Sequence, residues 1–306
     1  MKDFHKIRTK TMKKIISISF LLALSQSAFA ANISEDFEKR MLKEYTGQAK
    51  IKQKNDSIER NYNSDSGNYF LSSYKQNYLL PFSYSDDYNK KYWDEEGSMK
   101  DIESVFQVSV KYPLALDVTP YGGDVYVTYT NKSNWQTFSD GSPFRETNHE
   151  PELLVDFGQD WEFGGIQNTN IILGYNYQTN GQSGIEERSW NRLFTDFVFA
   201  HKDFSLSARV WLPFSESETE DKEISDYLGY HELNGRYYWN DQTFSAKTRW
   251  AFHNNKYGLT LGWEKPLTKA FSMYAEGFYG YGDTLIDFDQ KTERISVGFI
   301  FTNDLF

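Results

Sequence analysis

The stretch Phe204-Ser-Leu-Ser-Ala-Arg-Val-Trp-Leu, residues 204–212, alternates apolar and polar side chains with a period of two residues. One face would carry Phe204, Leu206, Ala208, Val210 and Leu212, and the other Ser205, Ser207 and Arg209. This period is typical of a β-strand whose two faces meet different surroundings. Residues 106–112 (FQVSVKY) and 244–250 (FSAKTRW) repeat the pattern. The sequence therefore predicts strands with one apolar face.

About twelve such segments follow one another along the chain. They lie near 75–83, 103–114, 123–132, 149–158, 166–177, 191–201, 203–213, 225–239, 242–253, 256–265, 270–281 and 293–303. Tight links at 201–203, 240–242 and 267–270 alternate with longer ones at 131–148, 178–190, 214–225 and 282–292. An even strand number, short turns at one end and longer loops at the other are typical of outer-membrane barrels. We expect an all-β fold, a single antiparallel transmembrane β-barrel of about 12 strands over residues 71–306. A soluble all-β sandwich or barrel would also show the alternation.

The composition supports a barrel in a membrane. The chain has 24 Phe, 22 Tyr and 8 Trp among 306 residues and is polar on average. Transmembrane barrels combine these properties, because lipid-facing and lumen-facing residues alternate and aromatic girdles mark both interfaces. A twelve-stranded barrel is narrow enough for side chains to fill much of its lumen. The charged residues expected to pair there are Arg145, Arg209, Arg236, Arg249, Glu264 and Glu276.

Two counts exclude other classes of function. The absence of cysteine rules out a disulfide scaffold and thiolate chemistry. The net charge of −10 argues against nucleic acid as a partner, because nucleic-acid binding requires a basic surface.

The N-terminus has the pattern of a secretory signal peptide over residues 1–30. Lys13 and Lys14 precede an apolar run, Ile15 to Leu24, and Ala28-Phe29-Ala30 supplies a small-x-small cleavage pattern. Met12 is an alternative start, and a buried N-terminal helix is the other interpretation. Residues 31–70 are polar and mixed in charge, and we interpret them as a periplasmic lead-in. The sequence predicts export through the periplasm to a bacterial outer membrane, with the chain crossing that membrane many times.

Four stretches resemble the outer-membrane phospholipase A family. They are SPFRETNHEPEL (142–153), GYNYQTNGQSGIEERSWNRL (174–193), YGDTLIDF (281–288) and the terminal NDLF (303–306). The resemblance runs over about residues 70 to 306. It implies a calcium-dependent phospholipase A1/A2 that hydrolyses acyl esters of outer-membrane phospholipids as a homodimer. In that family a Ser nucleophile is activated by a His, which an Asn orients, at the outward-facing edge of the barrel.

The family positions are only partly kept in this chain. Tyr177 stands at the His position and Thr179 at the Ser position, whereas Asn191 retains the orienting Asn. A hydroxyl nucleophile needs an adjacent base, and a phenol is mostly neutral near pH 7 and a poor base. We therefore expect the family reaction to be impaired here.

His149 is a candidate substitute base. A turn near Glu162–Phe163 would bring His149 level with residue 176 or 177 and allow it to approach Thr179. The alternative interpretation is an interfacial aromatic residue at a position where the family often has Tyr.

The resemblance also assigns the calcium positions. They are the backbone carbonyl of Gln182, the side chain of Glu187 and, from the partner subunit, the position of Gly141. Carboxylate and carbonyl oxygens are the ligands that calcium prefers. The alternative is a solvated acidic loop. Asn131 stands at the position of an amide near the family's dimer seam.

Three functions stay open at this point. The first is a phospholipase A homologue that still hydrolyses acyl esters. The second is a catalytically inactive barrel that acts structurally or binds lipid or cations, and the third is a small channel.

Overall fold

The computed structural model describes residues 71–85, 88, 99–118, 122–163, 166–201, 203–217, 222–268 and 270–301. The predicted signal peptide, the lead-in to residue 70 and the terminal NDLF motif lie outside these residues. No helix in the described part of the chain is long and apolar enough to span a membrane.

The described chain is almost entirely antiparallel strand. The strands are β1 (Ser72–Ser73), β2 (Asn77–Tyr84), β3 (Ile102–Ala115), β4 (Asp124–Trp135), β5 (Phe144–Phe163), β6 (Ile166–Thr179), β7 (Ser189–His201), β8 (Phe204–Glu216), β9 (His231–Trp239), β10 (Gln242–Ala251), β11 (Lys256–Pro266), β12 (Phe271–Tyr281) and β13 (Lys291–Phe301). A 3-10 turn η2 (Gly184–Glu186) and a short helix α3 (Ser225–Leu228) lie in loops.

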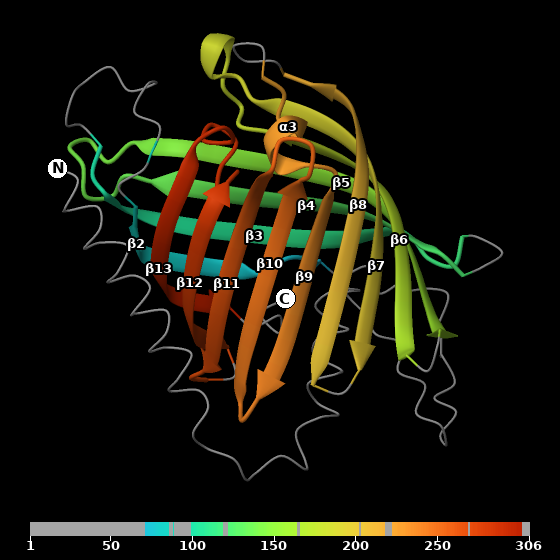
Figure 1. Cartoon of the computed structure of the whole chain (residues 1–306). Helices are drawn as coiled ribbons and strands as arrows, with labels where there is room; N and C mark the ends of the chain where they lie inside the picture. Colours follow the sequence, from blue (N-terminus) through green and yellow to red (C-terminus); the bar gives the residue numbers. More distant parts are fainter. Residues whose placement is uncertain are drawn as a thin grey trace. The chain divides into compact units, whose positions relative to one another are not determined.

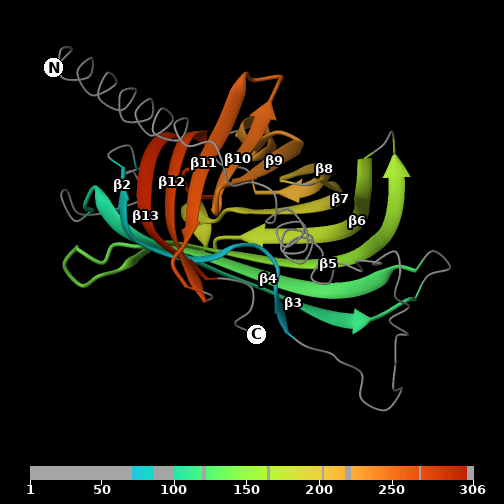
Figure 2. The same ribbon diagram turned by 90° about the horizontal axis from the view of Figure 1, so that it is seen from below.

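Strands β2 to β13 close into a barrel. Each strand from β2 to β13 pairs with its neighbour in sequence, and β13 pairs with β2, for example Phe299 opposite Leu79. The two-residue strand β1 is an addition, paired with β3. Figures 1 and 2 show these strands curving around one interior. The predicted closed barrel of twelve strands is confirmed.

The two faces of the wall differ as the alternation predicts. Along β8, Phe204, Val210 and Leu212 are exposed on the outside, whereas Ser205 and Ser207 are buried inside. An outward apolar face and a polar lumen are the arrangement of a transmembrane barrel.

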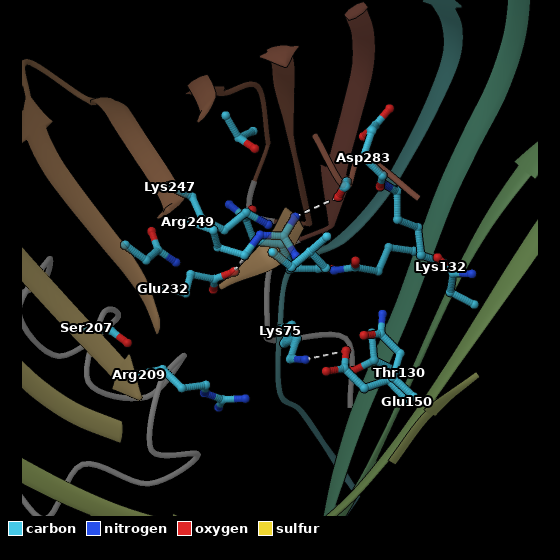
Figure 3. A pocket seen from close by; sticks show the side chains of 18 of the residues that line it. Lys75, Thr130, Lys132, Glu150, Ser207, Arg209, Glu232, Lys247, Arg249 and Asp283 are labelled. Atoms are coloured by element: carbon cyan, nitrogen blue, oxygen red, sulfur yellow. Dashed lines mark hydrogen bonds and ion pairs between the residues drawn. The ribbon is translucent and has the colours of Figure 1, made fainter. Parts of the chain in front are cut away.

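Ion pairs fill much of the lumen. Arg145 binds Glu103 (Nε to Oε2, 2.9 Å) and also contacts Asp287. Arg209 binds Glu152 (2.9 Å) and Arg294 binds Glu276 (2.7 Å). Of the residues expected to pair inside, Arg145, Arg209 and Glu276 do so, and Arg249 pairs with Glu232 at 3.9 Å. A cavity remains between these clusters, and Figure 3 shows Lys75 reaching Glu150 and Arg249 facing Glu232 across it.

Two strand boundaries differ from those predicted. The strand expected at 225–239 begins only at His231, because residues 225–228 form α3. The Glu216 carboxylate accepts hydrogen bonds from the amide and the hydroxyl of Ser225, both 2.8 Å, which favours a helical turn there. Strand β5 is longer than the predicted 149–158 and runs to Phe163, which is opposite Ile166 of β6.

Gly280 on β12 is required for its strand to close on β11. Its φ is +122°, and a Cβ there would overlap the carbonyl oxygen of Tyr257. We expect Gly280→Ala to lower the free energy of unfolding by roughly 2–3 kcal/mol, measured by urea titration of the refolded protein. Gly277→Ala is the matched control, because on the same strand its Cβ would lie 3.9 Å from the nearest atom, Arg294 O. Equal losses in both variants would contradict this explanation.

Candidate active site

A row of polar side chains crosses four neighbouring strands on the outer face of the barrel. Asn131 on β4 is opposite His149 on β5, His149 is opposite Thr179 on β6, and Thr179 is opposite Ser189 on β7. Directly opposed side chains on adjacent antiparallel strands have Cβ atoms about 5 Å apart. The register thus brings an imidazole beside a hydroxyl at the end of the strands that carries the longer loops.

The predicted pairing partner of His149 needs a correction. The sequence places it level with residue 176 or 177, but it pairs with Thr179. Strand β5 continues to Phe163, beyond the start of the predicted turn at 162–163, and moving a turn by one or two residues shifts every pair on the hairpin. The approach to Thr179 is therefore more direct than the sequence indicates.

Hydrogen bonds fix both members of this pair. His149 Nδ1 lies 2.6 Å from the Tyr129 hydroxyl and 3.5 Å from the Asn131 amide nitrogen. Thr179 Oγ1 accepts a 3.0 Å hydrogen bond from the Gly181 amide. A Cβ on Gly181 would lie 3.7 Å from His149 Nε2, so this edge of the ring faces the segment that binds Thr179.

The family's catalytic positions are arranged differently. Tyr177 is directly opposite Asn191. However, the side-chain Oδ1 of Asn191 accepts a 2.6 Å hydrogen bond from the hydroxyl of Tyr175. Within the described residues, no hydrogen bond of the Tyr177 side chain is found. The retained amide is thus engaged by a different phenol.

The loop after β6 is held by its own polar groups. The side-chain Oδ1 of Asn180 accepts from the backbone amides of Gln182 (3.3 Å) and Arg188 (2.9 Å). Arg188 Nη1 in turn donates to the carbonyls of Ile185 (2.9 Å) and Glu187 (2.7 Å). These contacts fix the backbone at the predicted calcium positions.

The oxygens required for a cation are partly present. Gln182 and Glu187 are both exposed, and no ion pair of the Glu187 carboxylate is found among the described residues. Gly141 lies in the loop between β4 and β5, exposed and with a φ of +75°. The described chain contains no cluster of three or more acidic or His side chains that would hold a metal. The loop therefore fits calcium only as part of a ligand set completed from elsewhere.

Two residues of the cluster were missed from sequence. Tyr129 and Tyr175 precede Asn131 and Tyr177 by two positions on the same outer face, so the strand period placed them beside the predicted sites. Tyr175 lies inside the motif at 174–193 but was given no role, and Tyr129 lies outside every quoted motif. Their hydroxyls nonetheless make the shortest contacts to His149 and Asn191.

The wall around the cluster is apolar. Leu153, Leu173, Leu193 and Phe214 are all exposed on the outer face of β5 to β8. A closed barrel with an apolar belt and a polar, ion-paired lumen is a transmembrane β-barrel. Its candidate site opens on the belt, where lipid is the neighbouring molecule.

Comparison with known proteins adds the family. A family model described as Phospholipase A1 matches residues 55–301. The chain is 33% identical to Phospholipase A1 of Escherichia coli K12 over 275 residues, covering 86% of this chain and 94% of that protein. It is 34% identical to Phospholipase A1 of Klebsiella pneumoniae over 257 residues, covering 82% and 88%. The chain belongs to the phospholipase A1 family, also called outer-membrane phospholipase A.

Solved structures agree. Outer membrane phospholipase A from Escherichia coli superposes with a TM-score of 0.71 at 33% identity, covering 77% of this chain and 95% of that one. The Salmonella typhi outer membrane phospholipase, described as a dimer with bound calcium, gives 0.72 at 31% identity, covering 78% and 95%. The family and the fold imply the outer membrane as the location of this chain.

Proposed function

We propose that this chain hydrolyses acyl esters of outer-membrane phospholipids, with a turnover well below that of a site containing His, Ser and Asn. The observation that carries the proposal is the outward-facing row in which Thr179 is directly opposite His149, within an apolar wall. A lipid ester in the surrounding bilayer reaches such a site without entering the lumen.

The chemistry expected is acyl transfer to Thr179. Its Oγ1 attacks the ester carbonyl carbon, the lysophospholipid alkoxide leaves, and water then releases the fatty acid from the acyl-enzyme. Tyr177 supports this poorly, because a neutral phenol is a weak base and Asn191 is engaged by Tyr175. The methyl group of Thr179 also narrows the approach. Both features predict a slow reaction.

Calcium and a second copy of the chain belong to the same proposal. Gln182 and Glu187 would hold the cation together with Gly141 of the partner subunit. A bound calcium ion would supply positive charge that stabilises the developing oxyanion. The ordered backbone of the loop 180–188 and the exposed Glu187 carboxylate support this assignment.

The first test is direct. Refolded protein with calcium should release fatty acid from a detergent-dispersed phospholipid, and Thr179→Val, which keeps the shape but removes the oxygen, should not. Ser183→Ala changes an exposed hydroxyl in the adjacent loop and should keep the rate. No release from the unmodified protein would refute the proposal.

The cation assignment has its own test. We expect Glu187→Gln to raise the calcium concentration for half-maximal release by about 10-fold, because removing a charged ligand weakens calcium sites. Glu186→Gln is the matched control on the neighbouring residue, and it should change this concentration little. Equal shifts would indicate that only the charge of the loop matters.

A second candidate function is a catalytically inactive barrel that binds lipid. Two observations on the described residues favour it: Tyr175 engages Asn191, and no hydrogen bond of the Tyr177 side chain is found. Such a barrel would bind phospholipid without hydrolysing it, and the fatty-acid assay with Thr179→Val distinguishes the two candidates.

A further inference from the structure

We propose that His149 is the general base of this site, acting on Thr179 from the neighbouring strand, and that Tyr129 positions its imidazole. The inference rests on the proposed ester hydrolysis and names the group that takes the proton from the nucleophile. It starts from the direct pairing of His149 with Thr179 across β5 and β6.

The orientation of the ring fits this role. One nitrogen, Nδ1, is held 2.6 Å from the Tyr129 hydroxyl, and the ring stacks on Tyr129 with centroids 6.2 Å apart. The opposite edge, with Nε2, faces Gly181, whose amide binds Thr179 Oγ1. A general base needs an imidazole held at one nitrogen with the other nitrogen turned toward the nucleophile's segment, and His149 has this arrangement relative to Gly181.

The proposed role requires one tautomer of His149. Nε2 can accept a proton only if Nδ1 carries the ring proton, and Nδ1 then donates to the Tyr129 oxygen. Asn131 stands next to this contact, 3.5 Å from Nδ1. In this tautomer the Tyr129 oxygen accepts from Nδ1 and leaves Nε2 free, which gives Tyr129 the positioning role.

The proton moves through a balanced cycle. As Thr179 Oγ1 bonds to the acyl carbon, its proton passes to His149 Nε2. The imidazolium then protonates the leaving alkoxide of the lysophospholipid. In the second half, water gives a proton to Nε2 while its oxygen attacks the acyl carbon, and that proton returns to Oγ1 as the fatty acid leaves. No external oxidant or further reactant is consumed.

The main experiment compares two histidine variants. We expect His149→Ala to reduce fatty-acid release at least ~100-fold, the usual contribution of a positioned base. His253→Ala, an exposed histidine in the turn between β10 and β11, should keep the rate. Barrel folding is checked for both by heat-modified mobility on a gel. An unchanged rate in folded His149→Ala overturns the inference but leaves the proposed hydrolysis standing.

A second readout does not depend on lipid turnover. An alkyl sulfonyl fluoride should label Thr179 in the unmodified protein, identified by peptide mass, and labelling should fall at least ~100-fold in His149→Ala. Equal labelling in both would overturn the inference. If the unmodified protein gave neither a labelled Thr179 nor fatty acid, both the proposed hydrolysis and the role of His149 would be overturned. Failure of the proposed function is thus distinguishable from failure of this inference alone.

Tyr129 is tested by a spectroscopic signature. In protein with ¹⁵N-labelled histidine, the nitrogen shifts should show the His149 proton on Nδ1, and Tyr129→Phe should move the population toward the Nε2 tautomer. Tyr237→Phe on β9, another exposed tyrosine, should leave the His149 signal unchanged. A His149 proton on Nε2 in the unmodified protein would contradict the assignment.

Discussion

Replacing Tyr177 by His and Thr179 by Ser together should raise fatty-acid release by about 100-fold. The imidazole introduced by Tyr177→His would stand directly opposite Asn191, whose carbonyl oxygen is within reach of a ring on the neighbouring strand. Serine would remove the methyl group that crowds the attacking oxygen. The gain should exceed the product of the two single variants, because a nucleophile and its base act as a unit.

The double variant also bears on His149. With an imidazole at position 177, we expect His149→Ala to cost less than about 10-fold, because a second base is then available. Tyr237→His, a substitution of the same kind on β9, is the control and should leave the rate unchanged. A double variant no faster than the unmodified protein would contradict our account of Tyr177.

Replacing Arg294 by Met should give the largest loss of stability, about 3–5 kcal/mol in the free energy of unfolding. Its guanidinium binds Asp283 at 2.7 Å and Glu276 at 2.7 Å, and none of the three side chains is more than 9% exposed. Removing the cation leaves two carboxylates in a site with little water. Urea titration of the refolded barrel measures the difference.

Lys222→Met is the matched control. It breaks the 2.7 Å ion pair with Asp289, in which both side chains are partly exposed, and exposed pairs contribute below about 1 kcal/mol. If both variants lost the same stability, burial would not be what makes the Arg294 pair important.

The ion pair between Arg294 and Asp283 predicts that the stability of the barrel depends on pH. Burial alone would raise the pKa of the Asp283 carboxyl, but the charges of Arg294 and Lys132 outweigh it and hold that pKa well below its ordinary value. A carboxyl whose pKa is lowered by folding stabilises the folded state at pH values above its pKa in the unfolded chain, about 4. This stabilisation is lost as the pH falls toward the pKa of the folded state. The stability gap between the unmodified protein and Arg294→Met should therefore narrow below about pH 4.

The wall of the barrel was predictable from sequence and the loops were not. Alternation along 204–212 fixes which residues face lipid, because a strand has only two faces. The helix α3 could not be predicted from this alternation. It depends on Glu216 accepting hydrogen bonds from Ser225, a contact across a loop that periodicity does not encode.

The candidate site shows the same division. The motif at 174–193 was sufficient to identify Tyr177, Thr179 and Asn191 as the family's catalytic positions. Whether His149 meets Thr179 depends on the exact position of the β5–β6 turn, which the sequence pattern places too early. The contact between Tyr129 and His149 spans 20 positions and requires both the register and the side-chain rotamers.

The pairing of β2 with β13 has a consequence for how the molecule is made. The first and last strands of the wall lie at opposite ends of the described chain, so before they pair the folding chain has two open strand edges and an unsealed apolar face. Open strand edges invite association with other chains. We therefore expect a chain shortened within the last strand to aggregate instead of closing into a smaller barrel.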